Sequence, residues 1–153
     1  MTAHRFEPRD PDHAARVARS FAAQAFMAHI GAELGAVAPG RVVISLPVRP
    51  DLCQQHGYVH AGAAWSIADS AAGYAAQSLM GPSDGVLTVE LKINLLAPAA
   101  GVRLVATGEV ERAGRQLTVA RADAEAEDEA GARRHVATAL GTFMRMPDLP
   151  DRV

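Results

Sequence analysis

The sequence predicts an α+β domain in which one long central helix is wrapped by a curved antiparallel sheet of about six strands. The first observation is the segment 60–80, which is rich in alanine, lacks proline and carries a single formal charge, at Asp69. Alanine is the best helix former, and a helix that is apolar on nearly every side is expected to be buried. The second observation is that strands joined by short turns follow this helix. A single buried helix then needs a sheet folded around it.

Composition points to one ordinary globular domain. The 153 residues are 49% apolar and 21% charged. A formal net charge of -2 gives no support for nucleic-acid binding, and no stretch approaches the roughly 18 apolar residues of a membrane span. Because the N-terminus lacks a secretory signal and Cys53 is the single cysteine, we expect a soluble cytoplasmic protein without disulfides, metal or cofactor. The expected organisation is a flexible segment over 1–11, a single domain over 12–146 and a tail over 147–153.

The first sixty residues predict one helix and two strands. Asp12 is a plausible N-cap, and Gly31 ends the amphipathic pattern that begins there. The turn around Pro39 and Gly40 separates two short apolar runs. The expected elements are, in order, a helix from Asp12 to about His29, strands over 33–38 and 41–49, and a loop over 50–59.

The residues after the alanine-rich helix predict a four-stranded meander. Between Val86 and Leu96 the odd positions are apolar and the even positions from 88 to 94 are polar, which predicts a half-buried strand. Pro98 ends this strand, and turn residues separate the remaining apolar runs. The expected strands are 86–96, 101–112, 115–127 and 133–145.

Asp69 is the residue that most needs an explanation. A buried carboxylate must be paired, protonated or exposed to a cavity, and burial raises its pKa toward the range of a general base. It could equally be satisfied by hydroxyl or backbone donors, or lie at a subunit interface. Its neighbours on the helix face are mostly small, which leaves room for a ligand. These neighbours are Gly62, Trp65, Ser66, Ala72, Gly73 and Ala76.

The segment that leads into the helix adds a second candidate feature. Residues 54–62 run directly into the helix, so its first N–H groups face this loop and could stabilise a developing oxyanion. His60 is expected to orient the loop or the helix start, with a proton-transfer role as the alternative. His56 and His60 have a spacing compatible with zinc, but no further ligand is evident nearby, so no metal is expected.

These residues carry a family resemblance. His60-Ala61-Gly62 followed by Ala68-Asp69-Ser70-Ala71 resembles the His-Gly-Gly and Ala-Asp-Thr-Ala signature of hotdog-fold acyl-CoA thioesterases, most closely the phenylacetate-pathway (PaaI-like) branch. The similarity extends over roughly residues 20–146. It also includes the following positions and segments: Gln54, Thr88, the hairpin 108–116 and the closing strand 139–143.

The resemblance implies hydrolysis of an acyl-CoA, with an aromatic or medium-chain acyl group among the possibilities. In this family the backbone N–H at the position of Ala61 polarises the thioester carbonyl, and the carboxylate at Asp69 acts as general base or nucleophile. Gln54 and Thr88 match positions that orient water or substrate. The implied substrate-binding residues are His60, Gly62 and Arg115. The departure from the family is Ala61, where a glycine is usual; alanine keeps the N–H but restricts the approach of the acyl group.

Helix geometry predicts that a single chain cannot form this site. Ala61 and Asp69 are separated by about 12 Å along one helix at ~1.5 Å per residue. Two antiparallel copies related by a twofold axis would bring Ala61 of one chain to Asp69 of the other. We therefore expect a homodimer with sites across its interface, and further a dimer of dimers. Two other functions remain open: a non-catalytic acyl-CoA-binding protein, and a hotdog hydratase or dehydratase, which would need a histidine paired with an acidic residue.

Overall fold

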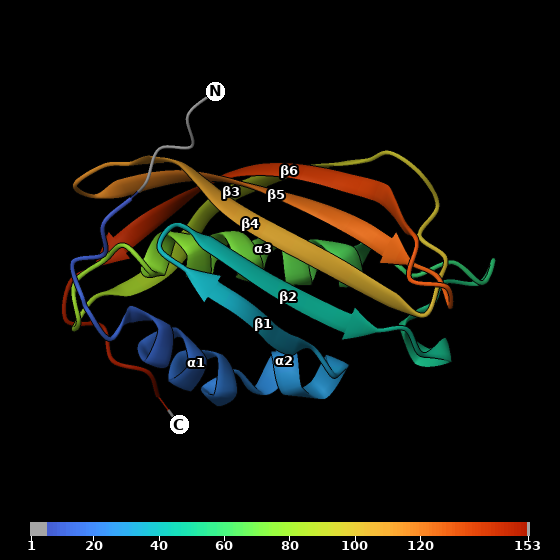
Figure 1. Cartoon of the computed structure of the whole chain (residues 1–153), viewed down its shortest axis with the longest axis horizontal. Coiled ribbons are helices and arrows are strands. Elements are labelled where there is room, and N and C mark those ends of the chain that lie inside the picture. The colour runs from blue at the N-terminus through green and yellow to red at the C-terminus, as the bar shows by residue number, and fades with distance from the viewer. Residues whose placement is uncertain (1–5, 153) are drawn as a thin grey trace.

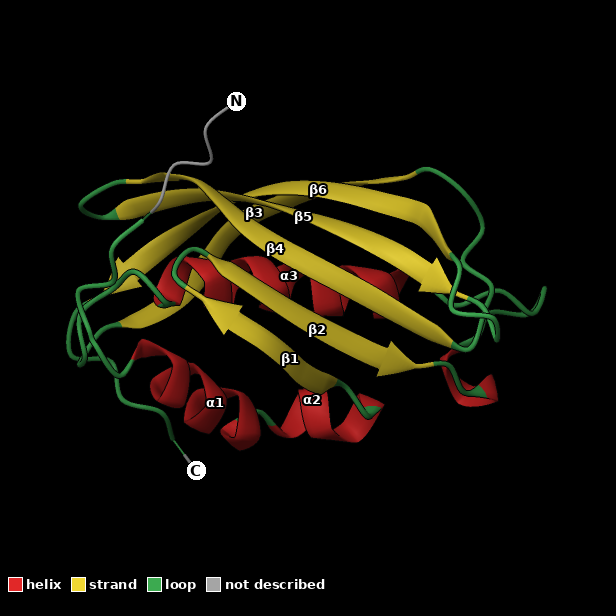
Figure 2. Cartoon of the chain, viewed as in Figure 1, coloured by secondary structure: helices red, strands yellow, loops and turns green. Residues whose placement is uncertain are grey.

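The computed structural model describes residues 6–152 and contains a six-stranded antiparallel sheet around one long helix (Figures 1 and 2). The predicted α+β class is confirmed, and the predicted strands agree with the observed ones to within a few residues. The elements are α1 (His13–Ala23), α2 (Ala25–Ile30), β1 (Glu33–Ala38), β2 (Arg41–Pro47), the 3₁₀ turn η1 (Pro50–Leu52), α3 (Ala61–Gln77), β3 (Gly85–Leu95), β4 (Arg103–Ala113), β5 (Leu117–Glu127) and β6 (Arg133–Met146).

The strand order is β1-β2-β4-β5-β6-β3, so β1 and β3 form the two edges. The chain passes from β2 to the far edge strand β3 through α3, which lies against the concave face of the sheet (Figure 1). Helices α1 and α2 lie outside the sheet, and α1 packs beside β1 and α3. This arrangement gives α3 a sheet on one side and leaves part of its N-terminal half uncovered.

Small residues let α3 lie very close to the sheet. A Cβ atom at Gly108 in β4 would lie 2.3 Å from the carbonyl carbon and oxygen of Ala71. The facing strand positions are alanines as well, and Ala106, Ala120, Ala122 and Ala124 are all fully buried. Because side chains this small add little thickness, the helix backbone and the sheet backbone are almost in contact.

The N-terminal helix differs from the sequence prediction. One helix was expected from Asp12 to about His29, but Gln24 is extended (φ −77°, ψ 94°) and separates α1 from α2. The Gln24 side-chain amide donates to the Tyr74 hydroxyl at 2.9 Å, so the break turns this side chain toward α3. Nothing local breaks the helix there, because neither glycine nor proline is present; the contact with α3 is a tertiary one.

Strand β3 also differs from its predicted alternation. The register of β3 against β6 shifts between Thr88 and Glu90, which is a β-bulge. Before the bulge Thr88 pairs with Phe143, whose side chain is fully buried against α3. After it Leu91 and Ile93 pack against the core, and Leu91 pairs with Gly141. The bulge therefore interrupts the expected alternation: Leu87 is 50% exposed, and the polar Thr88 faces the helix.

The C-terminal end of α3 is closed by a buried arginine that the sequence analysis did not single out. Arg16 in α1 donates to the carbonyl oxygens of Gln77 and Met80, at 2.9 and 3.0 Å. It also donates to the Asp10 carboxylate at 2.8 Å, and both side chains are buried. A cation at this position complements the partial negative charge of the helix end.

The chain termini make specific contacts. The buried Asp10 belongs to the predicted flexible segment 1–11, of which residues 1–5 lie outside the described part. In the predicted tail, Asp151 accepts a hydrogen bond from the Ser20 hydroxyl at 3.0 Å. The domain bounds stay a prediction. Within residues 6–152, none of the helices has the length and apolar character that crossing a membrane requires.

Candidate active site

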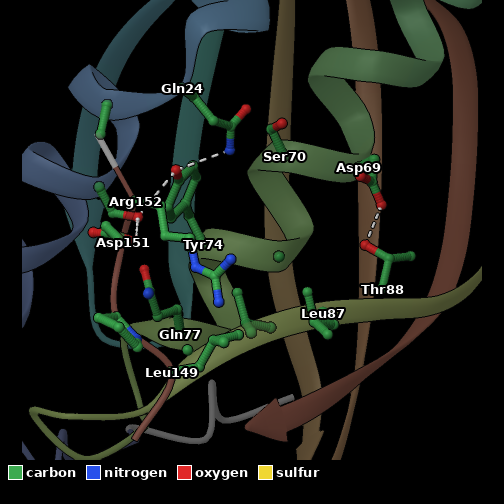
Figure 3. A pocket seen from close by; sticks show the side chains of 16 residues that line it. Gln24, Asp69, Ser70, Tyr74, Gln77, Leu87, Thr88, Leu149, Asp151 and Arg152 are labelled. Atoms are coloured by element: carbon green, nitrogen blue, oxygen red, sulfur yellow. Dashed lines mark hydrogen bonds between the residues drawn. The ribbon is translucent and has the colours of Figure 1, made fainter.

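Asp69 and Thr88 meet on the inner side of the sheet. The Thr88 hydroxyl donates to Asp69 Oδ1 at 2.8 Å, across the gap between α3 and β3 (Figure 3). The bulge in β3 makes this contact possible, because it places an even-numbered residue on the helix-facing side. Asp69 is half-buried rather than fully buried. The structure therefore gives Asp69 one fixed hydrogen bond and leaves its second carboxylate oxygen without a protein partner in the described chain.

The environment of Asp69 raises the pKa of its carboxyl group above the ordinary value. Burial is the main cause, because it disfavours the charged form. The hydrogen bond from Thr88 acts in the opposite direction and lowers the pKa, but by less. A carboxylate whose pKa is raised toward neutrality is a better proton acceptor than an ordinary surface aspartate.

Asp69 and Thr88 line a cavity of about 380 Å³ that extends along α3 toward its C-terminal end. Gly73 lies one turn after Asp69, so no side chain obstructs the cavity there. At its far end the Tyr74 hydroxyl is held by Gln24 and Ser20, and the Tyr74 ring packs edge-on against Phe21. Burial raises the pKa of the Tyr74 hydroxyl. Tyr74 was not singled out in the sequence analysis; the need of a buried tyrosine hydroxyl for a hydrogen-bond partner is the signal that was present.

Gln54, His60 and Ala61 line a second cavity, of about 570 Å³, at the opposite end of α3. His60 is the N-cap of the helix, and its Nδ1 accepts a hydrogen bond from the Gly62 N–H at 2.9 Å. The Ala61 N–H is exposed and has no hydrogen-bond partner within residues 6–152. An unpaired N–H at a helix start is a donor available to an anionic oxygen.

The loop before α3 fixes the position of Gln54. The backbone N–H of Gln54 donates to the Tyr58 carbonyl oxygen at 2.8 Å. Cys53 and Val59, on either side of this turn, pair as an isolated antiparallel β-bridge. The side-chain oxygen of Gln54 accepts from the His56 N–H. The Gln54 side chain is therefore engaged with its own loop, and its amide nitrogen is the group left to meet a ligand.

The remaining predicted residues lie apart from Asp69. Gly62 borders a shallow cavity on the outer side of α3 with His60 and Phe26. Arg115 is exposed in the turn between β4 and β5 and lines neither of the two larger cavities. A single chain thus brings Asp69 to Thr88, and Gln54 to His60 and Ala61, but it does not bring these two groups together. In the described chain no three His, Cys, Asp or Glu side chains are grouped as metal ligands.

Comparison with known proteins identifies the family. A model of the thioesterase superfamily matches residues 56–132, which is 77 of the 153 residues (132 − 56 + 1) and includes Asp69, Thr88 and the start of α3. The chain belongs to the thioesterase superfamily. It is 31% identical over 90 residues to the 1,4-dihydroxy-2-naphthoyl-CoA hydrolase of Listeria monocytogenes, a match that covers 59% of this chain and 73% of the relative.

Two solved structures share the fold. A thioesterase family protein from Silicibacter pomeroyi is 46% identical, with a TM-score of 0.86, and the match covers 88% of this chain and 98% of that one. The PaaI protein of the Escherichia coli phenylacetic acid degradation operon has a TM-score of 0.79 at 22% identity, with 90% and 95% coverage. At that identity PaaI supports the fold and does not decide the branch. The hotdog fold expected for this thioesterase-superfamily chain is confirmed.

Proposed function

We propose that this protein hydrolyses an acyl-CoA thioester to the free acid and CoA, with Asp69 as its catalytic carboxylate. The observation that carries the proposal is the Asp69–Thr88 pair on the wall of a cavity large enough for an acyl group. The raised pKa of Asp69 suits a proton acceptor. Since a relative in the superfamily is an acyl-CoA hydrolase, a CoA thioester is the substrate class that fits best. The PaaI-like branch and an aromatic or medium-chain acyl group are part of the proposal.

Two routes of hydrolysis are compatible with this geometry. In the first, Asp69 takes a proton from a water molecule while the water oxygen adds to the thioester carbonyl carbon. In the second, the carboxylate itself adds to that carbon, and water then hydrolyses the resulting anhydride. In both routes the C–S bond breaks, the sulfur of CoA leaves, and the carbonyl oxygen carries negative charge in the transition state. The Ala61 N–H stabilises that oxygen, and Thr88 and Gln54 orient the reactants.

The proposed catalytic unit is a homodimer. Asp69 lines one cavity and Ala61 the other, so one chain supplies half of each site. Strand β3 is an edge strand with unpaired main-chain groups, and its Val89 and Leu95 are 55% and 57% exposed. Trp65, on the uncovered side of α3, is 38% exposed. These surfaces fit a second copy that lies antiparallel along α3 and β3. We further propose that two such dimers associate, that the protein is cytoplasmic, and that His60, Gly62 and Arg115 contact CoA.

The other candidate functions have less support. A hydratase or dehydratase would need a histidine beside the acidic residue, and the described residues that line the Asp69 cavity include no histidine. A purely acyl-CoA-binding protein would have no use for a carboxylate with a raised pKa that is held in one orientation. Neither alternative explains the pairing of Asp69 with Thr88.

The test uses two variants that each remove one half of the site. Asp69→Asn keeps the shape and the hydrogen bond from Thr88 but cannot accept a proton. Ala61→Pro replaces the N–H by a ring carbon and so removes the donor, and proline is tolerated at the first position of a helix. His60 already has φ −61° and ψ 137°, the extended backbone that a following proline requires. We expect each pure variant to lose about 10²–10³ or more in kcat, as seen for a single oxyanion-hole donor.

Mixing the two variants tests whether the site crosses an interface. After unfolding and refolding together, half of the dimers should be mixed, and each mixed dimer should contain one intact site. The mixture should therefore recover about one quarter of the wild-type rate. Release of free CoA is followed with a thiol reagent across a panel of acyl-CoAs. Undiminished turnover by folded Asp69→Asn protein would exclude the catalytic assignment, and two inactive variants that do not complement each other would exclude the shared site.

A further inference from the structure

Gln77 has a buried side chain that no contact in the fold explains. It lies at the C-terminal end of α3 and is 4% exposed. Its Oε1 is buried and has no hydrogen-bond partner within the described chain. The backbone carbonyl oxygen of Gln77 accepts a hydrogen bond from Arg16. The main chain of Gln77 therefore contributes to the fold, whereas its side-chain amide does not. A buried polar atom without a partner is costly and calls for an explanation.

Gln77 lines the same cavity as Asp69 and also borders a neighbouring cavity of about 440 Å³. Gln77 and Asp69 line the cavity of about 380 Å³ from opposite ends (Figure 3). Asp69, Gly73 and Gln77 are spaced four residues apart and so lie on one face of α3, about 12 Å from first to last. Gly73 between them has no side chain. An acyl chain whose thioester lies at Asp69 can therefore extend along the helix toward Gln77.

We infer that Gln77 determines specificity for the acyl group, by hydrogen bonding to a hydroxyl at the end of the chain remote from the thioester. This inference rests on the proposed thioesterase function and names its substrate class. The amide nitrogen can donate to the hydroxyl oxygen, and after a half turn of the amide the buried Oε1 faces the cavity and can accept the hydroxyl proton. A hydroxyl is the group that satisfies Gln77 whichever way its amide is turned.

The surrounding charges favour a neutral distal group. Asp151 lines the same cavity from the C-terminal segment, so a second carboxylate would meet Asp69 at one end and Asp151 at the other. The hydroxyl of Tyr74 is already bonded to Gln24 and Ser20, whereas the side chain of Gln77 makes no hydrogen bond within the described chain. Arg152 also lines the cavity but is exposed, and its charge is hydrated.

The test compares matched pairs of substrates that differ only in the distal hydroxyl. Straight-chain and ω-hydroxy acyl-CoAs from hexanoyl to decanoyl are assayed for kcat/KM with the wild-type protein and with Gln77→Met. Methionine keeps the length of the side chain and removes both hydrogen-bonding atoms. The control is Gln116→Met, the same change at an exposed glutamine in the turn between β4 and β5. Thermal unfolding confirms that both variants are folded.

For one chain length, the wild-type protein should prefer the ω-hydroxy substrate by about tenfold or more, because the hydroxyl satisfies a buried amide. Gln77→Met should lose this preference while it still hydrolyses the unsubstituted chain, and Gln116→Met should match the wild type. Equal wild-type rates on both members of every pair, or an equal loss on both in Gln77→Met, would overturn the inference. The ω-carboxy acyl-CoA of the same length is assayed beside each pair, and a preference for it would overturn the inference in favour of Arg152.

A binding measurement separates this inference from the proposed function. Asp69→Asn protein is titrated calorimetrically with the same matched pairs, so that no turnover is needed. Tighter binding of the ω-hydroxy member that disappears in the double variant Asp69→Asn, Gln77→Met supports the role of Gln77 even if the wild-type protein hydrolyses no acyl-CoA. Equal binding of the pair, with hydrolysis intact in the wild type, rejects the role of Gln77 and leaves the thioesterase proposal in place.

Discussion

Replacement of Gly108 by alanine tests the close approach of α3 to the sheet. The new Cβ would lie 2.3 Å from the carbonyl carbon and oxygen of Ala71 and 2.4 Å from the nitrogen of Ala72. All three are main-chain atoms, so no side-chain rotation can relieve the overlap, and α3 must move away from β4. The Asp69–Thr88 hydrogen bond of 2.8 Å lies only two residues from the displaced turn, so Asp69 should move with it.

The size of the effect follows from two opposing contributions. Overpacking a close-packed core costs about 1–3 kcal/mol and occasionally more, and a clash with main chain belongs at or above the upper end of that range. Removing a glycine from the interior of a strand offsets roughly 0.5–1 kcal/mol of this. We therefore expect Gly108→Ala to lower the free energy of unfolding by about 2–3 kcal/mol. In a chain of this size the Tm should fall by roughly 5–10 °C.

The assay is urea unfolding followed by circular dichroism, at one protein concentration because association would stabilise the folded state. Gly73→Ala is the matched control on the same helix–sheet interface. Its Cβ would lie 3.6 Å from Phe143, an ordinary contact, and alanine in a helix should stabilise by up to about 1 kcal/mol. If Gly108→Ala is as stable as the wild type, or if both variants lose the same stability, the argument from backbone contact is wrong.

Three further variants test the buried charges and the pH dependence of the site. Arg16→Met should lower the free energy of unfolding by about 3–5 kcal/mol, because it leaves the buried Asp10 carboxylate and the carbonyl oxygens at the end of α3 unpaired. Urea unfolding measures this loss. A loss below about 1 kcal/mol would contradict the capping role of Arg16. Thr88→Val removes the hydrogen bond that lowers the pKa of Asp69, so the acid limb of the pH profile of kcat/KM should move to higher pH. The control is Thr142→Val, because Thr142 lines neither of the two larger cavities. This variant should leave the acid limb in place. Asp69→Asn should be more stable than the wild type at pH 8. Burial raises the pKa of the Asp69 carboxyl, so the folded wild-type protein loses stability as the pH rises through that pKa. The difference should disappear below the ordinary pKa of 3.8, and unchanged stability at every pH would show that burial of Asp69 has no energetic cost.

Local sequence patterns were sufficient for most of the fold. The alanine-rich segment around Asp69 predicted the long helix, and turn residues such as Pro39 and Pro98 predicted where the strands end. These signals are local, because helix propensity, alternation and turn chemistry depend on residues near in sequence. The separation of Ala61 from Asp69 was also available from the sequence, since the rise of a helix is fixed.

The differences from prediction all involve contacts between residues far apart in the chain. Gln24 interrupts the first helix where its side chain meets Tyr74, fifty residues later. Thr88 reaches Asp69 through a bulge, whose position depends on pairing with β6. Alternation along β3 contained no sign of that shift, because each side of the bulge alternates regularly by itself.

The sequence by itself therefore determined the type and order of the elements and the chemical nature of Asp69 as the candidate base. Only the tertiary structure decided which groups surround that carboxylate. It placed Thr88 beside Asp69 and left Ala61 at another cavity, and it put the unpaired amide of Gln77 at the far end of the Asp69 cavity. The physical reason is that burial and hydrogen-bond satisfaction are properties of packed elements, and no local propensity encodes them.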